Sequence, residues 1–280
     1  MTWDRYYHRI VEWTRSVNKP FFLWIFMLDT HFPYVTPWKE IQWTNVLEMY
    51  YRNYKFYNYI GKISYPSKKE IRKMINVYDN SIHYADKFFG EITRDLEKFD
   101  PIYIVTSDHG EAFFEKGYYG HDFPYLYEEN IHVPLIVYNL NIKSKAVSKP
   151  VSLLDLSTLI TTIPERNNCR DINVDRIFGG KPVVAKGIGY RRGIKRYCVI
   201  SNNWKYMKTV KNNKSEEKLY NIKNNLIVDF PKIADSLRQQ LKNEIEPQEN
   251  ARQELRRSSR RLSSQKKEIK RRLKRLGYLD

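Results

Sequence analysis

Aspartate and histidine side chains follow the ends of two apolar segments in this chain. Asp108 and His109 come directly after the apolar residues 102–106, and His31 comes shortly after the unbroken apolar run at 21–28. A carboxylate oxygen beside an imidazole nitrogen offers two donors to a divalent cation. An Asp-His pair at the end of a strand also commonly caps the next turn, so the pair by itself leaves both interpretations open.

A third histidine strengthens the metal interpretation. His121 lies in a loop rich in Gly, His and Tyr that runs from residue 111 to about residue 132. A single loop histidine is most often a surface residue. Two imidazoles and an Asp-His pair at the same edge of a sheet, however, could hold a metal and also donate hydrogen bonds to an anionic ester.

The elements that must position these side chains are indicated by the periodicity of the apolar residues. Three apolar runs predict strands, at 21–28, 102–106 and 133–138, and the first lacks alternation, which is typical of burial on both faces. Between the first two, Ser67 and Glu70 form a capping-box pattern that opens a helix. The buried stripe of this helix is predicted from residues at helical spacing: Ile71, Ile75, Tyr78, Ile82, Ala85, Phe89, Ile92 and Leu96. Strands and helices with long crossovers indicate an α/β fold with a partly parallel sheet, incomplete at one side.

The pattern changes after about residue 180. Short, closely spaced strand candidates with Gly and Asn between them predict an antiparallel meander, with strands at 183–188, 195–201, 204–210 and 218–222. A helix at about 231–246 is expected to pack on this small sheet. The chain therefore divides, on its sequence, into a partial α/β domain at 1–180, an antiparallel subdomain at 181–246 and a basic helical tail at 247–280.

The charge of the chain favours anionic partners. The net charge is +17, and the tail contributes twelve Lys and Arg against four Asp and Glu. Phosphate or sulfate esters, nucleic acid and acidic membrane surfaces all fit a surplus of this sign. Apolar residues recur every seven positions in the tail, but the stripe is too thin for a coiled coil. A solvated helix is the simplest interpretation; charge alone leaves nucleic acid open, without aromatic residues before Tyr278 to stack on bases.

Cysteine usage and hydropathy limit the setting in which the chain works. Cys169 and Cys198 are the only two cysteines, so a disulfide framework is excluded and a reducing, cytoplasmic location is expected. A signal lost with a missing N-terminal segment would change that expectation. No stretch approaches ~18 consecutive apolar residues, so we expect no transmembrane segment.

Four ordered groups of residues together resemble the sulfatase family of the alkaline phosphatase superfamily. The family pattern KPFFL…DPHxPY is similar to Lys19-Pro20-Phe21-Phe22-Leu23-Trp24 and Asp29-Thr30-His31-Phe32-Pro33-Tyr34, with Thr30 in place of the usual Pro. The helix pattern YDxxIxxxD is similar to residues 78–86. The pattern VTSDHGE…GH…YEE…VPLII resembles Val105-Thr106-Ser107-Asp108-His109-Gly110-Glu111, Gly120-His121, Tyr127-Glu128-Glu129 and residues 132–136. Residues 219–224 resemble LYDLxND, and the match covers almost the whole chain.

The resemblance implies a role for each candidate residue. Asp108 and His109 fall on a metal-ligand pair, for calcium or a similar divalent ion. His31 falls on a histidine that contacts the substrate. His121 stands where the family has a Lys or His that assists ester binding and departure of the leaving group. The implied substrate is a sulfate or phosphate monoester.

The resemblance also implies parts that this sequence does not contain. These are a first strand ending in two Asp metal ligands and a nucleophile segment of the form C-x-P-S-R or S-x-P-S-R. A cation with only two protein ligands is weakly held, because hard cations prefer about six donors, and the covalent route needs an activated nucleophile. We therefore expect this chain to be inactive alone, either as a half-enzyme that a separate N-terminal half completes or as a truncated reading frame of an active enzyme. A homo-oligomer is the other partner considered. The alternative is a non-catalytic remnant that binds a partner or an anionic ligand.

Overall fold

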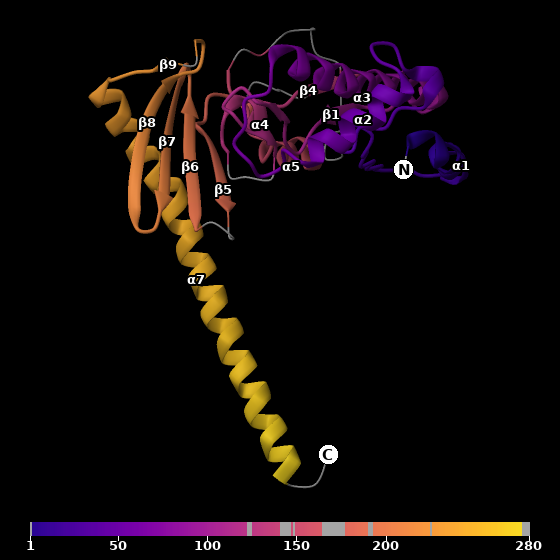
Figure 1. Ribbon diagram of the computed structural model, residues 1–280. Helices are drawn as coiled ribbons and strands as arrows, with labels where there is room; N and C mark the ends of the chain where they lie inside the picture. The colour runs from indigo at the N-terminus through magenta and orange to yellow at the C-terminus, as the bar shows by residue number, and fades with distance from the viewer. Residues whose placement is uncertain are drawn as a thin grey trace. The chain divides into compact units, whose positions relative to one another are not determined.

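The computed structural model describes residues 2–121, 125–140, 147, 149–163, 177–189, 193–224 and 226–275 (Figure 1). Cys169 and residues 276–280 lie outside the described residues. The chain divides into two compact units. The first consists of Met1–Ser144 and Thr162–Ile172, and the second of Lys145–Thr161 and Asn173–Asp280. Helices and strands are mixed, as expected for a partial α/β sulfatase-like fold.

The first unit contains four α-helices and two small sheets among its described residues. The helices are α1 (Tyr7–Ser16), α2 (Val46–Tyr57), α3 (Lys68–Asp95) and α4 (Glu128–Ile131). Short 3-10 helices lie at Trp3–Arg5, Trp38–Glu40 and Glu97–Phe99. The strands are β1 (Tyr103–Thr106), β2 (Ala112–Phe113), β3 (Tyr119–Gly120) and β4 (Leu135–Tyr138). Helix α5 (Asp155–Thr162) spans the division between the units.

Helix α3 begins where its capping pattern predicts. The Ser67 hydroxyl accepts a hydrogen bond from the Glu70 backbone N–H at 3.2 Å, which satisfies one of the unpaired donors of the first turn. The predicted buried stripe is confirmed in part. Ala85, Ile92 and Leu96 are buried and Ile82 is exposed, while the other four are half-buried against two aromatic clusters: Ile71, Ile75, Tyr78 and Phe89. The helix also buries residues outside the stripe, namely Met74, Val77, Asn80, Ser81, Tyr84 and Phe88. Apolar residues occupy a wide arc of this helix, and packing against both clusters decides which of them are buried.

Residues 21–28 differ from their predicted structure. They are extended but form no strand among the described residues, and they are buried on one side only. Ile25 and Met27 pack against the aromatic cluster that α1 and α3 share. The other side carries Phe22, Trp24, Phe26 and Leu28, which are 52–79% exposed. We call these four residues the apolar strip. An apolar run is buried on both faces only when a layer covers each face, and here one layer is present.

The sheets of the first unit are antiparallel. Strand β1 pairs with β4, with Tyr103 opposite Tyr138 and Thr106 opposite Leu135. Strands β2 and β3 form a hairpin, with Ala112 opposite Gly120. Every strand pairing in the described part of the chain is antiparallel, so the partly parallel sheet expected from the crossovers is not observed there.

The second unit contains the predicted antiparallel meander, with a fourth strand that begins earlier than expected and a fifth strand that was not expected. Its sheet has the order β5-β6-β7-β8-β9, with strands β5 (Val183–Gly189), β6 (Ile194–Ser201), β7 (Trp204–Lys211), β8 (Lys214–Asn221) and β9 (Leu226–Ile227). Gly193, Asn202, Asn212 and Asn213 have positive φ at the turns, a conformation that Gly and Asn adopt at the lowest cost. The turn residues therefore specify the strand boundaries.

One long helix covers a face of this sheet. Helix α7 (Pro231–Arg275) is continuous through Pro247 (Figure 1). Its first half packs Leu237 and Leu241 against Val199, Tyr206 and Leu219 of the sheet. The basic residues predicted to form a tail thus continue the same helix. No helix in the described ranges combines the length and apolar character that crossing a bilayer requires.

A buried arginine joins α2 to α3. Arg52 donates to Glu48 at 2.8 Å and to Glu70 at 2.5 Å, and its side chain is 3% exposed. Lys55 and Lys73 complete the network by pairing with the same two carboxylates. Removing the central cation would leave two partly buried carboxylates without their main partner, which is costly.

We predict that Arg52→Ala lowers the free energy of unfolding by about 3 kcal/mol, the range for breaking a buried ion pair. Lys87→Ala is the control. It removes a similarly short ion pair with Glu40, but Lys87 is 43% exposed, so its loss should cost less than about 1 kcal/mol. Urea denaturation followed by circular dichroism measures both values. Equal losses in the two variants would contradict the central role of Arg52.

We also predict that the apolar strip binds a hydrophobic-surface dye, because contiguous exposed apolar surface of this kind rarely occurs without consequence. The double variant Trp24→Ser, Phe26→Ser should lose most of the fluorescence enhancement of anilinonaphthalene sulfonate. Trp38→Ser is the matched control, since Trp38 is 70% exposed but lies outside the strip. A wild-type chain that binds no dye, or a loss of binding in Trp38→Ser equal to that of the double variant, would show that the strip is not the exposed apolar surface.

Candidate functional site

The β2–β3 hairpin determines where two candidate side chains meet. Because Ala112 lies opposite Gly120 in the antiparallel register, Glu111 and His121 are the next cross-strand pair. Gly120 has φ +90°, a left-handed conformation that a glycine adopts without steric cost. The Nδ1 atom of His121 lies 3.0 Å from Oε1 of Glu111. The hairpin therefore brings an imidazole onto a carboxylate ten residues away in sequence.

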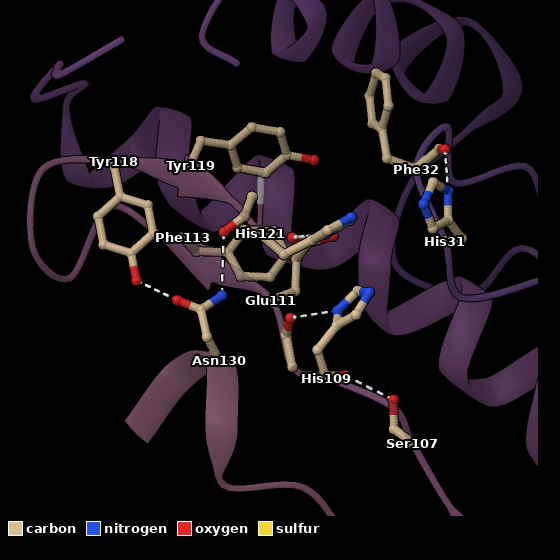
Figure 2. A network of polar contacts seen from close by, with 12 residues as sticks. His31, Phe32, Ser107, His109, Glu111, Phe113, Tyr118, Tyr119, His121 and Asn130 are labelled. Carbon is tan, nitrogen blue, oxygen red and sulfur yellow. Dashed lines mark hydrogen bonds and ion pairs between the residues drawn. The ribbon is translucent and has the colours of Figure 1, made fainter. Parts of the chain in front are cut away.

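Three imidazoles from three segments lie together at this hairpin. The ring centroids of His109 and His121 are 4.0 Å apart and nearly parallel, and those of His31 and His121 are 5.2 Å apart. His109 belongs to the turn after β1, His121 follows β3, and His31 follows the extended residues 21–28 (Figure 2). The three histidines chosen from the sequence thus form one cluster.

The same ring nitrogen is engaged in each histidine. Nδ1 of His31 faces the Phe32 carbonyl at 2.5 Å, Nδ1 of His109 faces the Gly110 carbonyl at 3.0 Å, and Nδ1 of His121 faces Glu111 (Figure 2). Carbonyl and ionised carboxylate oxygens only accept hydrogen bonds. Each neutral imidazole therefore carries its proton on Nδ1, and its lone pair is on Nε2.

Asp108 lies beside His109 with a geometry that suits a shared cation. Oδ2 of Asp108 is 3.7 Å from Nε2 of His109, and Oδ1 accepts from the His109 backbone N–H at 3.1 Å. Two donors about 2.3–2.6 Å from a calcium ion, at about 90–120° to each other, stand about 3.3–4.5 Å apart. The pair therefore fits a divalent metal as two of its ligands. Within the described residues, no group of three or more His, Cys, Asp or Glu side chains is arranged to hold a metal.

Gly110 is required by close packing. Its φ is not positive, so a left-handed backbone is not the reason for a glycine here. A Cβ at this position would overlap the Glu129 carbonyl oxygen. The Gly110 N–H donates to the Asn130 carbonyl at 2.9 Å, and the Asn130 side chain donates to the Gly120 carbonyl at 3.2 Å. Helix α4 thereby holds the Asp108–Gly110 turn and the hairpin together.

Sequence reasoning gave no role to Glu111, an enclosed carboxylate of the site. Its side chain is 7% exposed. While Oε1 faces His121, Oε2 accepts from the Tyr34 hydroxyl at 2.8 Å, and the Tyr119 hydroxyl donates to that of Tyr34 at 2.9 Å. Burial raises the pKa of both tyrosines, so each keeps its proton. The signal that could have found Glu111 is its place beside the Asp-His-Gly turn, ten residues before a histidine.

Cys198 has a different local setting, in the core of the second unit. It is fully buried in β6, in the sheet of the second unit. Buried thiols in apolar surroundings are inert, so Cys198 has the character of a core residue.

Comparison with known proteins agrees with these features. The Sulfatase family model matches residues 2–163, more than half of the chain. Arylsulfatase K of Rattus norvegicus is 25% identical over 296 residues, covering 85% of this chain and 51% of the relative. Phosphoethanolamine transferase EptA of Helicobacter pylori is 35% identical over 98 residues, which are 34% of this chain and 18% of the relative.

A solved structure supports the fold. That of a 2-O GAG sulfatase matches 88% of this chain and 58% of its own, with a TM-score of 0.54 and 17% identity. This chain spans about half the length of the arylsulfatases K that it matches. The family-model match and the ordered motifs around the histidine cluster lead to one conclusion: this chain belongs to the sulfatase family of the alkaline phosphatase superfamily.

Proposed function

We propose that this chain supplies one part of the active site of a metal-dependent hydrolase that cleaves sulfate or phosphate monoesters. The observation that carries the proposal is the convergence of His31, His109 and His121, beside Asp108, from three separate segments. The family membership and the net charge of +17 support an anionic substrate.

In this proposal Asp108 and His109 hold the divalent ion, calcium or a similar cation. When bound, the metal supplies positive charge that stabilises the developing negative charge on the ester. Nδ1 of His109 is held by the Gly110 carbonyl, which orients Nε2 as the ligand atom. Two protein donors give weak binding by themselves.

His31 and His121 act on the ester. Each holds its Nδ1 proton on an oxygen acceptor, so Nε2 is the atom that meets the substrate. A protonated Nε2 can donate to an anionic ester oxygen or pass its proton to the leaving group. The Nδ1–H of His121 donates to a carboxylate, whereas that of His31 donates to a backbone carbonyl.

The nucleophile comes, in this proposal, from a segment outside these 280 residues. The sequence holds no C-x-P-S-R or S-x-P-S-R segment, and the covalent route needs an activated nucleophile. The two sources that we consider are a separate polypeptide and a longer form of this chain. Location in the cytoplasm stays a prediction.

Relatives bear on the choice of ester. The matched proteins include arylsulfatases K and phosphoethanolamine transferases, so both sulfate and phosphate monoesters are candidate substrates. A second candidate function is anion binding without turnover. The absence of the nucleophile segment from the sequence favours it, and turnover separates the two.

We predict that the chain binds Ca²⁺ or Mn²⁺ weakly, with a dissociation constant on the order of 10⁻⁴–10⁻³ M, as measured by isothermal titration calorimetry. Asp108→Asn and His109→Ala should each weaken binding at least about tenfold. Asp86→Asn is the control, because Asp86 is an exposed carboxylate on α3. Unchanged metal affinity in both site variants would contradict the assignment of Asp108 and His109 as metal ligands.

We predict no turnover of an aryl sulfate or aryl phosphate by this chain alone with added metal. Mixed with a polypeptide that carries the nucleophile segment, it should turn over one of the two. In that assembly His31→Ala and His121→Ala should each lower kcat/KM by about 10²–10⁴-fold. His83→Ala is the control, since His83 contacts Gln42 outside the cluster. Near-normal activity in both site variants, or no turnover in any assembly, would refute the proposed function.

A further inference from the structure

We infer that Glu111 is a positioning residue for His121: its carboxylate fixes the Nδ1–H tautomer and the orientation of the ring, so that Nε2 faces the ester. This inference deepens the proposed function and rests on it for its catalytic consequence. Its structural content concerns only groups within this chain.

The two carboxylate oxygens of Glu111 are used separately. Oε1 accepts from His121 at 3.0 Å, and Oε2 accepts from Tyr34 at 2.8 Å. Tyr119 donates in turn to Tyr34. Each hydroxyl therefore donates its hydrogen bond in the same direction, from Tyr119 to Tyr34 and from Tyr34 to Glu111. Because the carboxylate receives a proton donor on each oxygen, it cannot rotate to another partner without losing a buried hydrogen bond.

Burial prevents Glu111 from acting on the ester itself. Its side chain is 7% exposed, whereas that of His121 is 22% exposed. Aromatic rings of Tyr34, Phe113 and Tyr119 pack together around this network. Glu111 thus works through the imidazole, in the way that a carboxylate behind a histidine fixes its tautomer and ring orientation elsewhere in proteins.

The backbone of the β2–β3 hairpin places Glu111 and His121 opposite each other. Glu111 and His121 are adjacent to the β2–β3 ladder, and Gly110 and Gly120, their immediate neighbours, are both tied to Asn130. A shift of the hairpin by one residue would move both side chains to the opposite face. The positions of acceptor and donor are therefore specified by the register and not by side-chain flexibility.

The experiment is a spectroscopic one on this chain. In protein labelled with ¹⁵N-histidine, long-range ¹H–¹⁵N correlation at alkaline pH reports which ring nitrogen of each neutral histidine carries the proton, and His121→Asn assigns the signal. The wild type should show His121 protonated on Nδ1. Glu111→Ala should move the proton population largely to Nε2. A wild-type His121 protonated on Nε2 would overturn the inference at once, before any variant is made.

Two further variants separate positioning from general loss of structure. Tyr34→Phe removes only the hydroxyl that donates to Oε2, so the Nδ1–H tautomer should persist. Glu115→Ala is the matched control: this glutamate of the same loop accepts from the Phe113 backbone at 2.6 Å instead of from a histidine, and the His121 signal should not change. If Glu111→Ala does not fold, the wild-type tautomer and its persistence in Tyr34→Phe still test the inference. A His121 tautomer unchanged in a folded Glu111→Ala would overturn it.

Activity gives the second readout where the proposed function holds. In an active assembly, Glu111→Ala should lower kcat by about 10–100-fold, the range for losing the partner of a working histidine, with KM within about twofold. A change in KM alone, with kcat unchanged, would contradict a positioning role for Glu111. An assembly without turnover would refute the proposed function, while the tautomer measurement would still decide the role of Glu111.

Discussion

A buried carboxylate must be fully hydrogen-bonded, and the geometry of this site depends on meeting that requirement at Glu111. Taking a charged group out of water costs several kcal/mol unless partners replace the solvent. His121 and Tyr34 are those partners here. These two hydrogen bonds fix the register of the β2–β3 hairpin, which is only two residue pairs long. They also fix the tautomer of His121 and the position of the His109 ring, whose centroid lies 4.0 Å from that of His121.

The site also shows how much of its chemistry is local to this chain. Three imidazoles have the same nitrogen engaged and lie beside one exposed carboxylate, and in the proposed function they supply proton donors and two metal donors. They do not supply the number of oxygen ligands that a hard cation prefers. Because the described donors cover only part of a coordination sphere, we predict weak metal binding.

The packing of the apolar strip affects how His31 is positioned. Phe22, Trp24, Phe26 and Leu28 alternate with residues that pack on α1 and α3, and the segment leads directly to His31. An extended segment held from one side is positioned less firmly than a strand in a ladder, because its backbone groups have no sheet partner to align them. How firmly His31 is held therefore depends on whether a second layer packs against the apolar strip.

The sequence by itself determined whatever depends on neighbours along the chain. It predicted the N-cap of α3 at Ser67, the turns of the β5–β9 meander at its Gly and Asn residues, and the family through the order of its motifs. These signals come from local backbone preferences or from residue identity, which tertiary contacts seldom reverse. Only the tertiary structure decided that the stripe of α3 excludes Ile82, that β1 and β4 are antiparallel, that residues 21–28 are covered on one side, and that Glu111 lies under His121. Periodicity reports that a face is apolar, but which layer covers it, and which strand meets which, are set by contacts between residues distant in sequence.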